Sequence, residues 1–515
     1  MRLQFGMLFF SFSSLGAQIV NYPLHKDGIE TNEPSIAIDP NHPNIQILGS
    51  NTSYFFTSED GGILWNPVFL KPKEGFYGDP VVYINRKGDY YVCHLSKNPF
   101  KKWPDQFDRI VFEKSTNSGK TFESVGIGLN GAKMQDKPWF YVDEGKKSKF
   151  RDCIYVAWTE FDKYGSRLPE DSSRIRFSAS SDGGSSFSEA ITVSDSCGDA
   201  ADEDNTLEGA TMATGIHGEL YLVWAGKGKI WLDVSTDGGK SWGKDKAIAE
   251  QRGSWNTEDI LGLMRSNSMP FITSDAKGCL YVVFGDNRNG DQDVYYLYSE
   301  NKGKSFTSPI RLHNDKVGNG KDQFMPAICY DQKKKNVYAA WYDRRNSEYN
   351  GYTDVYIAQL HGKKPGNSVR VNAESFCVPS PKIFFGDYLG VAAAKDEIRI
   401  AYALYDSEKD IVTVHIAGLQ AKALKAQNIT QPFLQIDQLK DTGLVYIHFN
   451  LPGYKSCTLE MLRGGQMIYK QLFNPLVSAD NEIQIPLQKL PAGVYKVTLS
   501  FKGKKIERDF YIERM

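Results

Sequence analysis

Short apolar runs recur along most of the chain and are separated by Gly, Pro, Asn, Asp and Ser. The strongest runs are residues 90–93, 154–158, 220–224, 280–284, 337–341 and 398–402. Apolar runs of this length, rich in Val, Ile and aromatic residues and bounded by turn-forming residues, are typical of buried β-strands. The pattern therefore predicts an all-β protein.

A short motif, Ser-x-Asp-x-Gly-x-x-Trp, repeats between the predicted strands. It occurs at residues 58–65, at 235–242 and, with Phe for Trp, at 180–187, and it carries Asn for Asp at 115–122 and 299–306. The Asp or Asn side chain can accept backbone N–H groups of a turn, the glycine allows positive φ, and the aromatic ring packs beneath the hairpin. The motif predicts a strand–turn–strand folding unit without a catalytic role.

A larger unit of four strands surrounds each copy of the motif. Units begin near Ser35, Pro80, Pro138, Ala210, Pro270, Pro326 and Tyr388. Seven four-stranded units predict a seven-bladed β-propeller, or a six-bladed one if an early unit is a decoration. The last unit lacks a fourth strand, which residues 18–21 can supply, and this pairing would close the ring and remove an exposed edge.

The two ends of the chain differ from the repeat. Residues 1–17 combine one arginine, a short apolar run and small residues, which is typical of a secretory signal peptide. The propeller is expected over residues 18–421. Residues 425–515 contain strand-like runs without the motif and predict a small C-terminal β-sandwich. No later segment is apolar and long enough to cross a membrane.

Composition narrows the function classes. Lysine plus arginine total 61 and aspartate plus glutamate 62, so a dedicated nucleic-acid binder is not expected. The seven cysteines form no Cys-x-x-Cys pair and the eight histidines are scattered, so we expect neither a metal site nor a cofactor. Buried thiols are the favoured interpretation of the cysteines, and one or two disulfides stay open.

Strand order predicts where chemistry can lie. The loop before each first strand and the loop after each second strand open at the same mouth, opposite the Ser-x-Asp turns. The first loops contribute Glu33, Asp79, Asp136, Lys137, Glu208, Asp387 and Tyr388, and the second contribute Glu160, Asp286, Arg288, Tyr342, Asp343, Arg344 and Arg345. Converging acids and arginines could bind a sugar acid and perform acid–base chemistry. For any one residue, a turn cap or an ion pair between blades is the alternative.

The motif repeats and the blade pattern over residues 32–420 resemble the sialidase superfamily of BNR-repeat proteins. This resemblance implies an exo-acting glycoside hydrolase that releases sialic acid or a similar acidic sugar from extracellular glycans. It implies a carboxylate clamp of Arg288, Arg344 and Arg345, with Asp79 or Asp136 as acid/base.

The same resemblance implies Tyr388 or Tyr342 as nucleophile, Glu208 as its polarising partner, and Asp343 in the catalytic set. The remaining mouth residues would bind substrate. The chain departs from the family at Glu33-Pro34-Ser35, where sialidases carry Arg-Ile-Pro, and its three arginines come from two adjacent units. A polysaccharide lyase, or a non-catalytic propeller that binds glycan or protein, are the alternatives.

Residues 490–497 and 503–505 resemble the C-terminal sorting domain of the type IX secretion system. This resemblance implies that the protein is secreted or held at the cell surface, with the secretion machinery as a partner. An ordinary accessory sandwich is the alternative.

Two loops carry further hints. Residues 98–104 place aromatic rings and lysines near the mouth, where they could stack on sugar rings or form a solvated flap. Residues 195–204 are acidic and could hold calcium, although their spacing does not match an EF-hand and a solvated loop is favoured.

Overall fold

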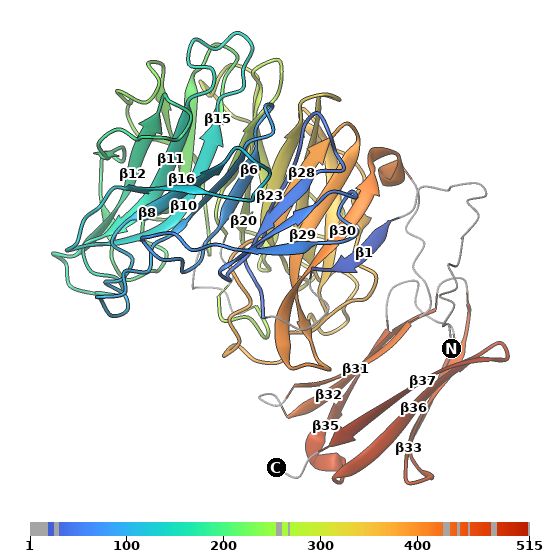
Figure 1. The fold of residues 1–515 in the computed structure, drawn as a ribbon. Coiled ribbons are helices and arrows are strands. Elements are labelled where there is room, and N and C mark those ends of the chain that lie inside the picture. Colours follow the sequence, from blue (N-terminus) through green and yellow to red (C-terminus); the bar gives the residue numbers. More distant parts are fainter. Residues whose placement is uncertain are drawn as a thin grey trace, which may run out of the picture.

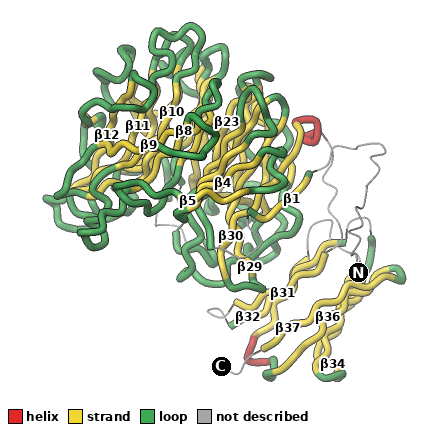
Figure 2. The backbone as a smooth tube through the Cα atoms, viewed as in Figure 1, coloured by secondary structure: helices red, strands yellow, loops and turns green. Residues whose placement is uncertain are grey.

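The computed structural model is almost entirely β-structure, as predicted. It describes residues 19–24, 30–253, 260–265, 268–425, 433–439, 443–451, 454–474 and 481–512. Its helices in these ranges are two short 3₁₀ segments, η1 (Ala421–Lys425) and η2 (Leu487–Lys489), and Figure 2 shows strands and loops elsewhere. None of the helices described is long and apolar enough to span a membrane. The expected signal peptide, residues 1–17, lies outside the described residues.

The first part of the described chain forms seven antiparallel sheets. The first three contain β2 (Ser35–Ile38), β3 (Gln46–Gly49), β4 (Tyr54–Ser58) and β5 (Asn66–Phe69); β6 (Val81–Ile84), β7 (Tyr90–Leu95), β8 (Ile110–Ser115) and β9 (Glu123–Ile127); and β10 (Met134–Val142), β11 (Ile154–Phe161), β12 (Ser172–Ser180) and β13 (Ile191–Thr192), with β14 (Gly198–Asp199) also pairing with β12. Strands follow chain order within each sheet, so each unit is a meander, as the repeat predicts.

The next four sheets repeat this plan. They contain β15 (Glu208–Thr214), β16 (Leu220–Gly226), β17 (Lys229–Ser235) and β18 (Lys246–Glu250); β19 (Phe271–Ser274), β20 (Leu280–Asp286), β21 (Asp293–Ser299) and β22 (Ile310–Arg311); β23 (Gln323–Asp331), β24 (Asn336–Asp343), β25 (Asp354–His361), β26 (Lys364–Pro365) and β27 (Val369–Arg370); and β28 (Gly390–Ala394), β29 (Glu397–Asp406) and β30 (Ile411–Gln420). The N-terminal strand β1 (Val20–Pro23) pairs with β30 and adds a fourth strand to the last sheet.

The first strands of the seven sheets lie together (Figure 1). Each contacts the first strand of the next sheet, and β28 contacts β2. A cavity of about 230 Å³ is lined by residues from all seven of these strands, among them Ile36, Val82, Trp139, Met212 and Phe271. Residues that precede the first strands are therefore brought to one place, which positions the site described below.

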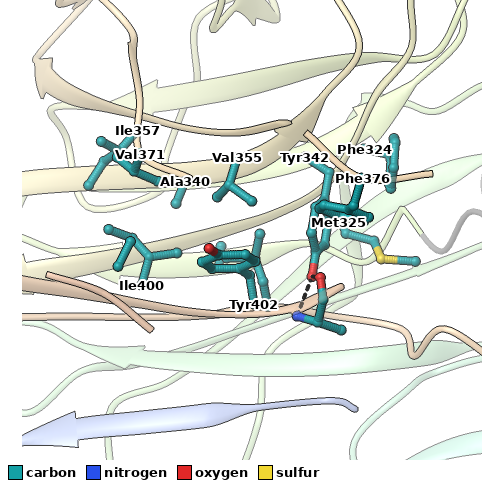
Figure 3. Packing of buried hydrophobic residues seen from close by; sticks show 14 of the residues in the cluster. Phe324, Met325, Ala340, Tyr342, Val355, Ile357, Val371, Phe376, Ile400 and Tyr402 are labelled. Atoms are coloured by element: carbon teal, nitrogen blue, oxygen red, sulfur yellow. Dashed lines mark hydrogen bonds between the residues drawn. The ribbon is translucent and has the colours of Figure 1, made fainter. Parts of the chain in front are cut away.

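Apolar side chains fill the space between neighbouring sheets. Figure 3 shows this packing where β23–β25 face β28–β30, with Phe324, Tyr342 and Phe376 against one another and Ile400 opposite. Because both faces of the sheets are covered, the second strands are buried throughout, which explains their near-continuous apolar sequence.

The Ser-x-Asp turns have the local structure that the motif predicts. At the first copy, Asp60 Oδ1 accepts the N–H groups of Ile63 and Leu64, each at 3.0 Å, and the Ser58 hydroxyl accepts the N–H of Gly62 at 2.9 Å. The Trp65 indole donates to the Gly62 carbonyl at 3.0 Å. These bonds satisfy the turn within itself, so the motif stabilises the hairpin.

The C-terminal residues form two further sheets around a second apolar core (Figure 1). One contains β31 (Phe433–Leu439), β32 (Leu444–Asn450) and β35 (Asn481–Pro486), and the other β34 (Gln466–Phe473), β33 (Cys457–Arg463), β36 (Gly493–Phe501) and β37 (Lys504–Ile512). They contact the loop after β24, where the Tyr352 ring lies 4.0 Å from that of His448 and Glu482 accepts the Tyr349 N–H at 3.1 Å.

Removing one turn carboxylate tests the folding role of the motif. Hydrogen bonds from Ser186 hold the pKa of Asp182 at about 2. We expect Asp182→Ala to lower the free energy of unfolding by about 0.5–1 kcal/mol, because the exposed N–H groups of Ser185 and Ser186 lose their acceptor to water. Urea unfolding measures the change.

Asp182→Asn is the matched control, since Asn117 and Asn301 occupy the same position in two other copies. It should keep most of the stability. Equal losses in both variants would contradict a role for the accepting oxygen.

Candidate functional site

The backbone just before the first strands is held in an unusual conformation. Glu33, Asp79, Lys137 and Met325 have φ of 50°, 53°, 46° and 48°, and each precedes a proline; Gly209, in the equivalent position of the fourth sheet, has φ of 70°. Left-handed φ in residues other than glycine carries strain, and such strain concentrates at functional sites. The same device thus recurs at the same end of five sheets.

Bulges accompany this conformation. The pairing of β10 with β11 shifts between Asp136 and Trp139, and that of β15 with β16 shifts between Glu208 and Thr211. A bulge breaks the strict alternation of side chains and re-aims the residues beside it. The acids at the start of the first strands can therefore face the centre, although the strands behind them keep an apolar packing face.

A buried lysine, Lys137, contacts acids that come from three other sheets. Lys137 Nζ lies 3.5 Å from Glu33 and 3.6 Å from Asp79, forms a close ion pair with Asp387, and its side chain is only 6% exposed. Asn51 donates to the Glu33 carboxylate and accepts the Asp79 N–H at 2.7 Å. These acids precede the first strands of three other sheets, so one cation holds four sheets together at the mouth.

Three side chains that the sequence analysis did not select as site residues, Arg265, Asp202 and Tyr164, complete this network. Arg265 Nε donates to Asp387 at 2.7 Å, and Arg265 Nη1 donates to Asp202 at 3.0 Å. The Tyr164 hydroxyl also donates to Asp202, at 2.6 Å. A signal for Arg265 was present, because it lies in the loop before Pro270, the start of the fifth unit. Asp202 was read only as part of an acidic loop.

The charges divide the carboxyl groups into two classes. Burial alone would raise the pKa of Asp387, but Arg265 and Lys137 hold it below its usual range. Burial and the nearby Asp79 raise the pKa of Asp136 to about 8. Burial, Asp202 and Asp136 raise the pKa of Glu208 well above its usual range. The site therefore holds protonated and ionised carboxyl groups side by side at neutral pH.

Several buried polar atoms at the mouth make no hydrogen bond among the described residues. Both carboxyl oxygens of Glu208, Oδ2 of Asp79 and the hydroxyl of Tyr388 are buried without a hydrogen bond among the described residues. A small pocket beside them is lined by Asp79, Lys137, Trp139, Gly209, Met269 and Tyr388. The pocket has a volume of about 10 Å³, so it has room for a water molecule beside these groups.

Tyr388 lies at the floor of this pocket, with its ring 6.1 Å from that of Trp139 in an edge-on contact. Burial and the charges of Glu33 and Asp79 raise its pKa well above the usual value. The hydroxyl is therefore held protonated, which favours a hydrogen-bonding role over that of the nucleophile implied by the resemblance.

The three arginines that were expected to clamp a carboxylate have other partners in the structure. Arg345 Nε pairs with Asp343 at 2.9 Å and Arg288 Nε pairs with Asp286 at 2.6 Å. Arg344 is fully buried, where its guanidinium donates to Thr353 and to the carbonyls of Asn350 and Leu261.

These Asp–Arg pairs repeat because they close a turn. In each, the aspartate at the end of the second strand accepts the backbone N–H of the arginine two residues on, at 2.8 Å in Asp286 and Asp343. The guanidinium then stacks on a tyrosine of the third strand, Tyr295 or Tyr356. The similarity of the two sequences thus reflects a shared structural bond.

Two further candidates are likewise held within single sheets or apolar clusters. Glu160 accepts from Arg174 at 3.0 Å and from Gln135 at 3.2 Å. The Tyr342 hydroxyl accepts the Ala403 N–H at 2.9 Å inside the apolar cluster (Figure 3). In the part of the chain that the structure describes, neither forms a hydrogen bond or ion pair with Lys137, Glu33, Asp79 or Asp387.

The acidic loop at residues 195–204 uses its carboxylates within the protein. Asp202 bonds to Arg265 and Tyr164, Asp199 accepts the Thr206 hydroxyl at 2.8 Å, and Asp195 accepts the Asp245 N–H at 2.9 Å. Within the ranges that the structure describes, no group of three or more His, Cys, Asp or Glu side chains could hold a metal ion.

Comparison with known proteins adds little beyond this geometry. No protein-family model matches the chain, and no curated protein matches it. Similar solved structures include a protein of unknown function from Dyadobacter fermentans (11% identity, 78% of this chain and 99% of that one, TM-score 0.42), the NanB sialidase from Streptococcus pneumoniae (7%, 73% and 83%, 0.43) and the α-L-arabinofuranosidase Arb93A from Fusarium graminearum (13%, 77% and 99%, 0.42). At these identities and scores the likenesses decide neither family nor activity.

Removal of the central cation tests the network. Lys137→Met leaves Glu33, Asp79 and Asp387 buried without their shared cation, so we expect the free energy of unfolding to fall by about 3 kcal/mol or more. Urea unfolding at neutral pH measures it.

The double variant Lys137→Met with Asp387→Asn removes the lysine together with the carboxylate that pairs with it most closely. It should be more stable than the sum of the two single changes predicts. Strict additivity would show that the two groups are not coupled.

Proposed function

We propose that residues 18–421 form a seven-bladed β-propeller closed by β1, and that its mouth is the site of a glycoside hydrolase. The contacts between successive first strands, the cavity that all seven line and the pairing of β1 with β30 support this closed ring. Closure removes exposed sheet edges, as a propeller requires.

The observation that carries the catalytic proposal is the division of carboxyl groups at the mouth. Glycoside hydrolysis needs one protonated carboxylic acid for the leaving oxygen and one carboxylate as base or nucleophile. Asp136, with a pKa of about 8, is protonated at neutral pH and we assign it as general acid. Asp79, whose Oδ2 accepts no hydrogen bond from the residues that the structure describes, is assigned as the carboxylate.

Neighbouring groups have supporting roles. Lys137 Nζ lies 3.6 Å from Asp79 Oδ2 and orients that carboxyl group. Glu208 and Tyr388 have buried polar atoms that make no hydrogen bond among the described residues, and we assign them to hydrogen bonds with sugar hydroxyls. Glu33 and Asp387 hold Lys137 in place, which makes them positioning residues.

The charge of the mouth favours an uncharged sugar. Lys137 and Arg265 are both engaged by carboxylates, and Arg288, Arg344 and Arg345 are engaged elsewhere. An anionic sugar would face the excess of acids without a guanidinium clamp, and such like-charge contacts are costly. We therefore propose a neutral sugar instead of the acidic sugar that the resemblance implies.

We also propose that the protein is exported and that residues 425–515 direct its sorting. The N-terminal pattern of residues 1–17 and the resemblance of residues 490–497 and 503–505 support this. Deleting residues 425–515 in the source cell should leave the protein in the periplasm, measured by fractionation. Unchanged release into the medium would contradict the sorting role.

Loss of the proposed acid should abolish turnover. We expect Asp136→Asn to lower kcat/KM on neutral aryl glycosides by about 10²–10⁴-fold, the usual contribution of general acid catalysis. In the wild type, activity should fall as pH rises through about 8, because Asp136 loses its proton there. Asp136→Asn activity equal to wild type would contradict the assignment.

Stability supplies the control for this variant. The folded pKa of Asp136 lies above its unfolded value, so its stabilising contribution is full below the unfolded pKa and is lost as pH rises through about 8. Asp136→Asn should therefore be more stable than wild type at pH 8 and gain little at pH 4. Inactivity in a more stable protein would then reflect lost chemistry.

A further inference from the structure

Aromatic side chains extend from the acid cluster onto the protein surface. Tyr77, Trp103 and Phe100 are 42%, 59% and 96% exposed, although side chains of this size are usually covered. Tyr77 lies two residues before Asp79, and the other two lie in the loop after β7. Several exposed rings close together mark a binding surface more often than isolated ones do.

Two of these rings, those of Trp103 and Tyr77, are connected to the site. Tyr164, whose hydroxyl donates to Asp202, packs edge-on against Trp103 with ring centroids 5.7 Å apart. Burial and the charges of Asp79 and Asp136 raise the pKa of Tyr77, while the Trp103 indole partly offsets that rise. Tyr77 and Trp103 therefore stand between the carboxyl groups and solvent.

The loop that carries the outer rings is fixed by its own hydrogen bonds. Asn98 donates to Asp108 at 2.7 Å through its side chain and to the Gln106 carbonyl at 3.0 Å through its backbone. Lys101 Nζ donates to the Gly131 carbonyl at 2.7 Å. The protein thus holds Phe100 and Trp103 in place without burying them, which is pre-organisation for a ligand.

We propose that Tyr77, Trp103 and Phe100, the aromatic platform, stack on successive sugar rings of a glycan whose terminal sugar enters the acid cluster. This proposal rests on the proposed function and adds that the substrate is an oligosaccharide or polysaccharide chain. Aromatic faces pack on the C–H faces of sugar rings while the ring hydroxyls stay in water, which suits half-exposed rings at a wet mouth. Continuity with Asp79 and Asp136 selects a glycan over a protein or membrane surface.

The platform is tested by binding, with catalysis removed. Asp136→Asn protein is run through native gels that contain soluble xylan, arabinan, galactomannan or mucin, alone and with Trp103→Ala or Phe100→Ala added. We expect retardation by at least one polysaccharide and a loss of affinity of about tenfold with Trp103→Ala. Phe69→Ala, which removes a half-exposed ring from the outer strand β5, is the matched control and should bind normally.

Catalysis gives a second and separate readout. In the otherwise wild-type protein, Trp103→Ala should raise KM for the retarding polysaccharide about tenfold, a larger change than it causes in KM for a small aryl glycoside. Phe100→Ala guards against misfolding, because a side chain that is 96% exposed contributes little to the core.

Two results overturn the proposal: no retardation in any polysaccharide gel, or retardation that both alanine variants keep. Binding to phosphatidylcholine vesicles that Trp103→Ala abolishes, without glycan binding, would also overturn it in favour of a membrane contact. Glycan binding without turnover of any substrate would sink the proposed hydrolase and leave the platform standing. Turnover of aryl glycosides without glycan binding would support the proposed hydrolase and overturn the aromatic platform.

Discussion

The site depends on one buried ion network in which Lys137 is shared by Glu33, Asp79 and Asp387. A buried lysine is tolerated only where carboxylates replace its lost hydration, and buried carboxylates in turn need a cation. Each member comes from a different sheet, so the network can form only if the sheets meet at their first strands. The chemistry of the mouth therefore depends directly on how the sheets pack.

The network also explains why neighbouring carboxyl groups differ. Cations are too few to neutralise every acid, so Asp387 takes the charge contacts of Lys137 and Arg265 while Asp136 and Glu208 keep protons. Left-handed backbone at Glu33, Asp79 and Lys137 and the bulges behind them add strain at the same place. Stability is sacrificed at the mouth, which is the usual cost of an organised site.

How much the sequence could predict follows from the range of each interaction. The Ser-x-Asp turns close within a few residues, so their motif was sufficient to predict them and, through their repetition, the all-β meanders. Acids that precede a proline were found because they recur at unit starts. Asp286 with Arg288 and Asp343 with Arg345 show the opposite case, since a local turn bond and a clamp for substrate have the same sequence pattern. Arg265 and Asp202 lie in irregular loops, and only the folded chain brings them to Asp387 and Tyr164.

The central claim is that convergence of the sheets keeps Asp136 protonated at neutral pH. The most direct measurement is the titration of carboxyl-labelled aspartates by ¹³C NMR in wild type and in Asp136→Asn. The account predicts one carboxyl resonance that titrates near pH 8 in the wild type and is absent from the variant. The contrary result would be that the resonance lost in Asp136→Asn titrates below about pH 5, as aspartates do in model peptides.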